Sequence, residues 1–161
     1  MGIKLKKGLI SLLMIVLGVI IFSTFIYMKS RQPFVQAREE TITIAKENTD
    51  LTTVEKFYWY NNKKSYFSVS GMNKKEEAII VIVEQDGGKV VVLNPGEFIS
   101  ESVARKIART ELKPNKILET RIGLEEGVPV WEVTYEQDNG KLGYYILSAK
   151  EGNWLKDIKN I

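Results

Sequence analysis

The sequence predicts an α+β protein in which an N-terminal transmembrane helix is followed by two tandem units, each a helix packed on an antiparallel β-meander. Three observations support this prediction. An uncharged apolar run covers residues 8–28. After residue 50 the chain changes to short alternating segments separated by turn residues, a pattern typical of strands joined by hairpins. After a breaker at 94–96, a helical pattern and four strand-like segments occur again.

The run at residues 8–28 is long enough to cross a membrane. It has 21 residues without a charge, mostly Leu, Ile, Val, Phe and Met. As a helix it is about 31 Å long, close to the thickness of the hydrocarbon core of a bilayer, and it lacks the polar face of a soluble core helix. A cleaved signal peptide is the alternative, but its apolar region is usually about 7–15 residues long and ends in small residues. Here the run is longer and ends in bulky residues at 25–28.

Basic residues near the ends of the run predict its orientation. Lys4, Lys6 and Lys7 precede it, whereas Glu39 and Glu40 partly offset the basic residues that follow. We therefore expect a single-pass protein of the cytoplasmic membrane, with its N-terminus in the cytoplasm and its C-terminal domain outside the cell. The expected parts are a cytoplasmic tail (1–7), a transmembrane helix (8–28), a first unit (29–94) and a second unit (95–161).

The composition after the run argues against catalysis and nucleic-acid binding. Three of the 23 basic residues precede the run, so the remainder carries 20 basic and 20 acidic residues and lacks the net positive charge that nucleic acid attracts. The chain has no histidine and no cysteine, which excludes disulfides, cysteine-linked lipid, cysteine-based zinc sites and His-dependent triads. The acidic residues show no converging pair of the kind a glycosidase needs. We expect no enzyme activity, no catalytic or metal-binding residue and no cofactor.

Each unit is predicted to begin with a helix and to continue with four strands. In the first unit, Pro33 suits the first turn of a helix over 33–48 that is nearly continuous with the membrane helix, although the β-branched run at 41–44 lowers helix propensity. In the second, Ser100 is a good N-cap, and Pro114 stops the helix. Between them an apolar stripe recurs at helical spacing: Val103, Ala104, Ile107, Ala108 and Leu112. The predicted strands cover 53–60, 65–71, 78–84 and 89–93 in the first unit, and 117–124, 130–136, 142–148 and 153–158 in the second.

The two units are related by an internal duplication with a register of 64 residues. Under that shift the strands superimpose without a gap, and Phe67 matches Trp131; the helices match better at a shift of 63. We expect Trp131 to be a core aromatic beneath a helix face formed by Val103 and Ile107. A ligand-stacking role for Trp131 is the alternative.

The duplication also indicates a candidate surface. In the strand at 117–124, alternation separates a core face from a solvent face: Leu118, Ile122 and Leu124 against Glu119, Arg121 and Gly123. The shift of 64 places Phe57 and Trp59 on the corresponding solvent face of the first unit. Large aromatics are unusual on a free face and favoured in interfaces. Phe57 and Trp59 therefore form either an internal interface or part of a surface that docks a partner.

Three stretches, at 63–71, 100–112 and 129–135, resemble the TseB-like (YpmB-like) cell wall elongation regulators of Gram-positive bacteria. The last is the most specific, because an apolar–Trp–Glu–Val–x–Tyr strand recurs in PepSY-like units. Members of this family are small membrane-anchored proteins with two PepSY-like (cystatin-like) units, so the resemblance extends over nearly the whole chain. It implies a non-enzymatic regulator of peptidoglycan synthesis during cell elongation that contacts a penicillin-binding protein or another wall-synthesis enzyme. The motifs carry over no catalytic or ligand-binding residue.

Two other classes of function remain open. PepSY units elsewhere occur in protease propeptides, so the alternative is an inhibitor or chaperone of a secreted or membrane peptidase. A wall hydrolase that acts through paired carboxylates is a third class, which digestion of purified peptidoglycan would test.

Overall fold

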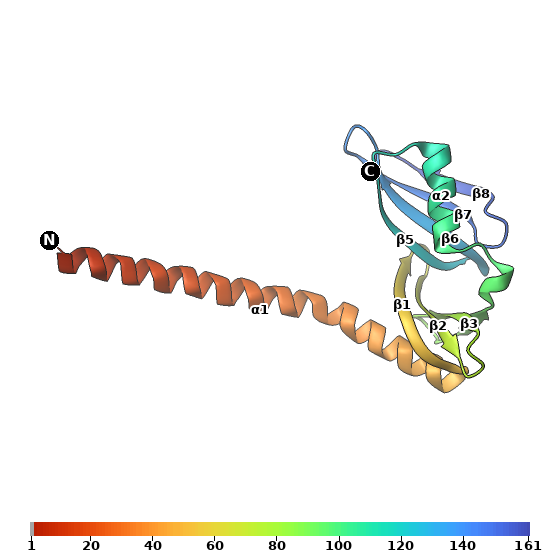
Figure 1. Cartoon of the computed structure of the whole chain (residues 1–161), viewed down its shortest axis with the longest axis horizontal. Helices are drawn as coiled ribbons and strands as arrows, with labels where there is room; N and C mark the ends of the chain where they lie inside the picture. Colours follow the sequence, from red (N-terminus) through yellow and green to blue (C-terminus); the bar gives the residue numbers. More distant parts are fainter. Residues whose placement is uncertain (1) are drawn as a thin grey trace. The chain divides into compact units, whose positions relative to one another are not determined.

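The computed structural model describes residues 2–161, with the side chains from residue 8 onward except those of residues 11 and 95. By its internal contacts the chain divides into two compact parts that differ from the duplicated units, with the boundary between Ala37 and Arg38. Figure 1 shows the elements in chain order. They are α1 (Gly2–Asn48), β1 (Leu51–Asn61), β2 (Ser65–Asn73), β3 (Ala78–Glu84), β4 (Val90–Leu93), the 3₁₀ turn η1 (Pro95–Glu97), α2 (Glu101–Leu112), β5 (Lys116–Glu125), β6 (Val128–Glu136), β7 (Leu142–Ser148) and β8 (Trp154–Ile158).

Helix α1 joins the two helices predicted at 8–28 and 33–48 into one element. Among the described residues it is the one helix long and apolar enough to span a membrane, and its apolar side chains between Leu9 and Met28 are exposed. Pro33 lies inside α1, so the helix does not begin at this residue, and the predicted helix at 33–48 is continuous with the predicted membrane helix. A proline removes one backbone hydrogen bond, while the turns on either side keep theirs. The side chains of the predicted cytoplasmic tail, including Lys4, Lys6 and Lys7, lie outside those described.

The remaining elements confirm the predicted fold class. Strands β1–β4 form one antiparallel meander and β5–β8 form a second, with neighbours in chain order paired in each sheet. Every predicted strand is present, with bounds that differ by at most two residues. The last turns of α1 pack on the first sheet, where Ala45 is buried in one cluster with Val69 and Val81. Helix α2 packs on β5 and β6 of the second sheet.

Helix α2 has the predicted N-cap and most of the predicted apolar stripe. The Ser100 hydroxyl accepts a hydrogen bond from the backbone N–H of Val103, which satisfies a free donor of the first turn. The buried residues of the helix are Ala104 and Ala108, whereas Val103 is 41% exposed and Ile107 is partly buried. The predicted stripe is therefore confirmed at Ala104 and Ala108, with Ile107 and Leu112 packed against the same core, and it is wrong only at Val103.

Trp131 is a core residue, as predicted. It is 2% exposed, and its indole Nε1 donates a hydrogen bond of 2.9 Å to the carbonyl oxygen of Ile99. The ring also meets Tyr58 of the first sheet edge-on, with 5.9 Å between the ring centroids. A buried indole needs a partner for its N–H, and the loop before α2 supplies one.

Bulges in the first strand of each sheet change the predicted faces. In β5 the pairing with β6 shifts between Ile117 and Glu119, so Leu118 lies at the irregularity and is 41% exposed instead of facing the core. Strand β1 has an additional shift, between Val54 and Lys56. Each bulge inserts an extra residue and reverses the alternation that follows it.

Because of the additional bulge, the two units match along β1 at a shift of 63 residues, and the predicted shift of 64 is wrong there. Trp59 pairs with Phe67, and Ile122 pairs with Trp131. With Phe67 and Trp131 equivalent, the counterpart of Trp59 is Ile122 and not Gly123, at a shift of 63. Phe57 and Trp59 therefore correspond to residues on the face of the second sheet that α2 covers.

Candidate functional site

The predicted surface residues Phe57 and Trp59 belong to an aromatic cluster on the first sheet. Phe57 stacks on Phe67 with 6.1 Å between ring centroids, and Trp59 meets Phe67 edge-on at 5.1 Å. We call Phe57, Trp59 and Phe67 the aromatic cluster. All three are partly buried, so none is a free surface side chain.

The aromatic cluster lies on the face of the first sheet that carries Val69. Phe57 packs against the core cluster that contains Ala45 of α1, together with Val69 and Val81. The sequence predicted a solvent face here because the additional bulge in β1 was not foreseeable. Phe67, which touches both predicted residues, was missed because the alternation of side chains along its strand does not by itself show which face is buried.

The opposite face of β1 meets the second sheet. The hydroxyl of Tyr58 donates a hydrogen bond of 3.1 Å to Oε2 of Glu101, and Nζ of Lys56 lies 2.7 Å from the same oxygen. The buried Ser68 hydroxyl donates to the carbonyl oxygen of Ile122 across 3.0 Å. Burial raises the pKa of Tyr58, and the Glu101 carboxylate raises it further. These contacts join β1 to the first turn of α2, and β2 to β5.

Tyr60 covers Gly123 at the same junction. Tyr60 is fully buried, and a Cβ built on Gly123 would lie 2.3 Å from its Cδ1 and Cγ atoms. Burial raises the pKa of Tyr60 to about 12, against the hydrogen bond from Asn62. Gly123 is therefore buried, and the prediction that it faces solvent is wrong because the aromatic side chain of the first sheet occupies the space above it.

A second group of charges lies on the same face of the second sheet as Gly123. Arg121 pairs with Glu132 at 3.3 Å and with Glu119. Glu132 is 5% exposed, and burial raises the pKa of its carboxyl while the Arg121 guanidinium acts in the opposite direction. Arg121 Nε and Thr134 Oγ1 are buried without a hydrogen-bond partner. The sequence predicted that Arg121 faces solvent; it is instead half-buried because Glu132 draws it onto the sheet.

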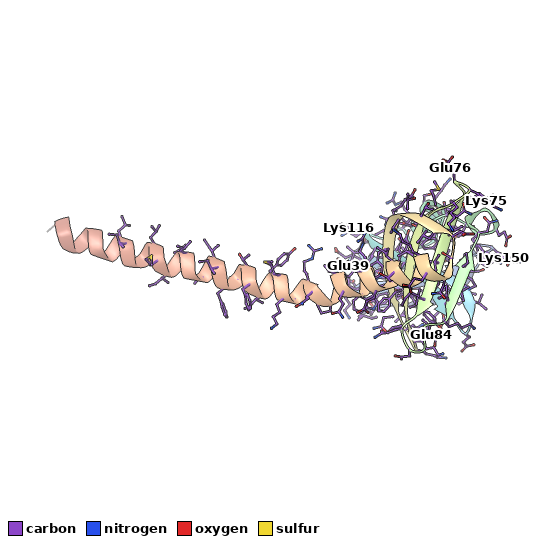
Figure 2. All side chains as sticks on the ribbon, turned by 90° about the horizontal axis from the view of Figure 1, so that it is seen from below. Glu39, Lys75, Glu76, Glu84, Lys116 and Lys150 are labelled. Carbon is purple, nitrogen blue, oxygen red and sulfur yellow. The ribbon has the colours of Figure 1, made fainter. Side chains whose placement is uncertain are left out.

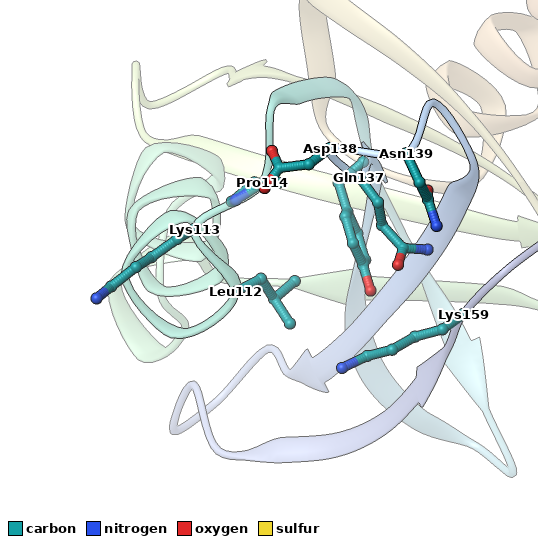
Figure 3. A pocket seen from close by; sticks show the side chains of 8 residues that line it. Leu112, Lys113, Pro114, Gln137, Asp138, Asn139 and Lys159 are labelled. Carbon is teal, nitrogen blue, oxygen red and sulfur yellow. The ribbon is translucent and has the colours of Figure 1, made fainter.

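One cavity lies at the C-terminal end of α2 (Figure 3), with a volume of about 290 Å³. Three of its polar side chains bond to residues beside the cavity. The Tyr135 hydroxyl donates to Asp157 at 2.9 Å, and Nζ of Lys159 lies 2.9 Å from the other oxygen of that carboxylate. Gln137 Nε2 donates to the carbonyl oxygen of Leu142. These bonds hold the side chains of Tyr135, Gln137 and Lys159 in place at the edge of the cavity.

Within the described residues, no group of three or more acidic side chains converges to hold a metal ion. The buried carboxylate Glu132 is paired with a cation, which suits a structural role more than proton transfer. Glu101, which joins α2 to Tyr58 and Lys56, was missed because the first turn of a helix commonly carries an acidic residue without any long-range contact.

A family model, a relative and a solved structure all point to the same protein family. Residues 40–84 match the model of the cell wall elongation regulator TseB-like domain. The chain is 32% identical over 157 residues to the probable cell wall elongation regulator TseB of Bacillus subtilis (strain 168), covering 95% of this chain and 98% of the relative. The solved structure of the YpmB protein from Bacillus subtilis is 33% identical, with a TM-score of 0.67, covering 75% of this chain and 95% of that structure. This chain therefore belongs to the TseB-like family of cell wall elongation regulators.

Proposed function

We propose that this protein is a membrane-anchored, non-enzymatic regulator of peptidoglycan synthesis during cell elongation, and that it acts by contact with a penicillin-binding protein. The identity of 32% to a probable cell wall elongation regulator, over 95% of the chain, is the observation that carries the proposal. The matching fold of the YpmB protein supports it. Membership of the family supports the role in cell elongation. Contact with a penicillin-binding protein goes one step beyond what the family name says.

The N-terminal part of α1 serves as a single membrane anchor in this proposal. Its exposed apolar side chains need a nonaqueous environment, and its length suits a bilayer. The lysines before residue 8 keep the N-terminus in the cytoplasm by the positive-inside bias, so residues 29–161 lie outside the cytoplasmic membrane. Anchoring raises the effective concentration of this part at the membrane surface, where even a weak contact with a membrane enzyme becomes significant.

Orientation is tested with protease added to intact spheroplasts. The proposal predicts that the region after residue 28 is digested while a cytoplasmic marker protein survives. Protection of that region, with digestion after the membrane is permeabilised, would reverse the topology and exclude contact with an extracytoplasmic enzyme.

We infer that Phe57 and Trp59 act inside the fold and not as the docking surface. Their contacts with Phe67 and the packing of Phe57 on the core beneath α1 support this choice between the two roles. Replacing both residues with serine in the anchored protein tests it. Reduced stability supports the internal role, whereas normal stability with loss of partner cross-linking would make them the docking patch.

The partner itself is identified by cross-linking in intact cells, followed by purification of this protein and mass spectrometry. Recovery of a penicillin-binding protein supports the proposal. Recovery of a peptidase in its place would support the alternative function, an inhibitor or chaperone of a secreted or membrane peptidase.

A further inference from the structure

A cavity of about 250 Å³ lies where the turns of the two sheets meet. Its wall on one side comes from the β1–β2 turn and the two ends of the β3–β4 connection, and on the other from the β5–β6 turn. Both sheets therefore contribute to it, unlike the cavity at the end of α2. Its volume lies just below the usual range of ligand pockets, about 300–1,000 Å³, and suits a small ligand.

The floor of this cavity is apolar and its rim is held by contacts between the turns. Tyr66 and Leu124, one from each sheet, are buried beneath it. At the rim, Nζ of Lys63 lies 3.0 Å from Oε1 of Glu126, and the Asn62 amide donates 3.3 Å to Glu125. The rim contacts hold the two turns together, so the cavity has a defined shape without a ligand.

Two charges that line the cavity have no ion-pair partner. Lys63 is paired with Glu126, and Lys64 is paired with Glu84. Within the part of the chain that the structure describes, Lys89 and Glu125 form no ion pair. Lys89 comes from the first sheet and Glu125 from the second. The cavity thus has a cation on one wall and an anion on the other that belong to no ion pair, although the Glu125 carboxylate accepts the hydrogen bond from Asn62.

We propose that this cavity binds a zwitterionic ligand of the size of an amino acid or a dipeptide. The ligand's carboxylate pairs with the ammonium of Lys89, and its amino group pairs with the carboxylate of Glu125. Its aliphatic part covers Tyr66 and Leu124. A charged hydrogen bond at each end of the ligand gives Lys89 and Glu125 an opposite charge. Removing the apolar floor from water adds a hydrophobic contribution to binding. Because the ligand touches both sheets, its binding also stabilises their junction.

The test uses the full-length protein in detergent micelles and alanyl-alanine as the probe, with binding measured by isothermal titration calorimetry. The all-D and all-L dipeptides are titrated separately, each also with its amino group acetylated or its carboxylate amidated. We expect saturable binding of at least one free dipeptide, weakened about tenfold or more by either block, because each block removes one charged contact.

Matched variants locate the binding. Lys89→Gln and Glu125→Gln remove the two free charges and should each weaken the free dipeptide about tenfold or more. Lys75→Gln and Glu76→Gln are the controls, since these exposed residues lie at the opposite edge of the same unit from Glu84, which lines the cavity (Figure 2). The controls should bind as the wild type does, and circular dichroism should show all four variants folded.

The preference for chirality identifies the source of the ligand. Tighter binding of the all-D dipeptide indicates a peptide of the cell wall, tighter binding of the all-L form indicates a protein fragment, and equal binding indicates a site that reads only the two charges. Absence of binding by both forms up to about 10 mM, or equal binding by the blocked dipeptides or by the two cavity variants, would overturn the proposal. None of these results depends on contact with a penicillin-binding protein, so the two proposals fail separately.

Discussion

Replacing Gly123 by alanine should destabilise the protein through a single steric contact between the two sheets. A Cβ at this position would lie 2.3 Å from Cδ1 and Cγ of Tyr60, and 2.7 Å from its Cβ. Tyr60 is fully buried, so its ring has no free space to enter and the sheets must separate slightly. Elsewhere in a strand, alanine would be preferred to glycine by about 0.5–1 kcal/mol.

The expected cost combines these two effects. Overpacking in a well-packed core costs about 1–3 kcal/mol, and the gain from replacing glycine offsets part of it. We expect Gly123→Ala to lower the free energy of unfolding by about 1–2 kcal/mol. Tyr60→Ala alone should cost about 3–5 kcal/mol, because it removes a buried aromatic ring.

A double-mutant cycle distinguishes this contact from a general effect of the substitution. Once Tyr60 is alanine, the added methyl group of Gly123→Ala has space, and its cost should fall to zero or become a small gain. Urea unfolding of the full-length protein in micelles, followed by tryptophan fluorescence, measures all four free energies. An equal cost of Gly123→Ala in both backgrounds, or no cost in the wild type, would refute the packing of Tyr60 on Gly123 and with it the junction of the sheets.

Three further variants test the packing and the charges. Phe57→Ser with Trp59→Ser should lower the free energy of unfolding by about 3–5 kcal/mol, since both rings are partly buried; an unchanged urea midpoint would contradict an internal role. Trp131→Phe should cost about 1–3 kcal/mol, because it leaves the carbonyl of Ile99 without its donor, and a midpoint equal to that of the wild type would exclude this bond. Because burial raises the folded pKa of Glu132 above 4.5, its contribution to stability is present below that pH and is lost as pH rises through the raised value. The stability of the wild type relative to Glu132→Gln should therefore fall as pH rises above 4.5 in urea unfolding, and a rise would contradict the cause given for the shift.

The sequence was sufficient to predict the elements and their order. Alternation and turn residues place all eight strands, because each strand has one face in a core and each turn needs residues that tolerate tight geometry. The core position of Trp131 followed for the same reason. The continuity of α1 through Pro33 was less predictable, since a proline can begin a helix or interrupt one, and its neighbours decide which.

The candidate surface was harder to predict because it depends on pairing between strands. The additional bulge between Val54 and Lys56 moves Phe57 and Trp59 to the face that carries Val69, and nothing in β1 alone marks it. The burial of Gly123 likewise depends on Tyr60, which is 63 residues away in sequence. Contacts of this kind are set by how the two sheets meet, which periodicity within one strand does not encode.

The most direct test of the proposed function is to cross-link proteins in living cells and to purify this protein by a tag at its C-terminus. A labelled penicillin then detects any penicillin-binding protein that is recovered with it. The proposal predicts that such an enzyme is recovered with the anchored protein and not with a tagged single-span protein of unrelated sequence. It also predicts weaker recovery when residues 1–28 are replaced by a cleavable signal peptide, because release from the membrane lowers the effective concentration. Recovery of a peptidase and no wall-synthesis enzyme would contradict the proposal.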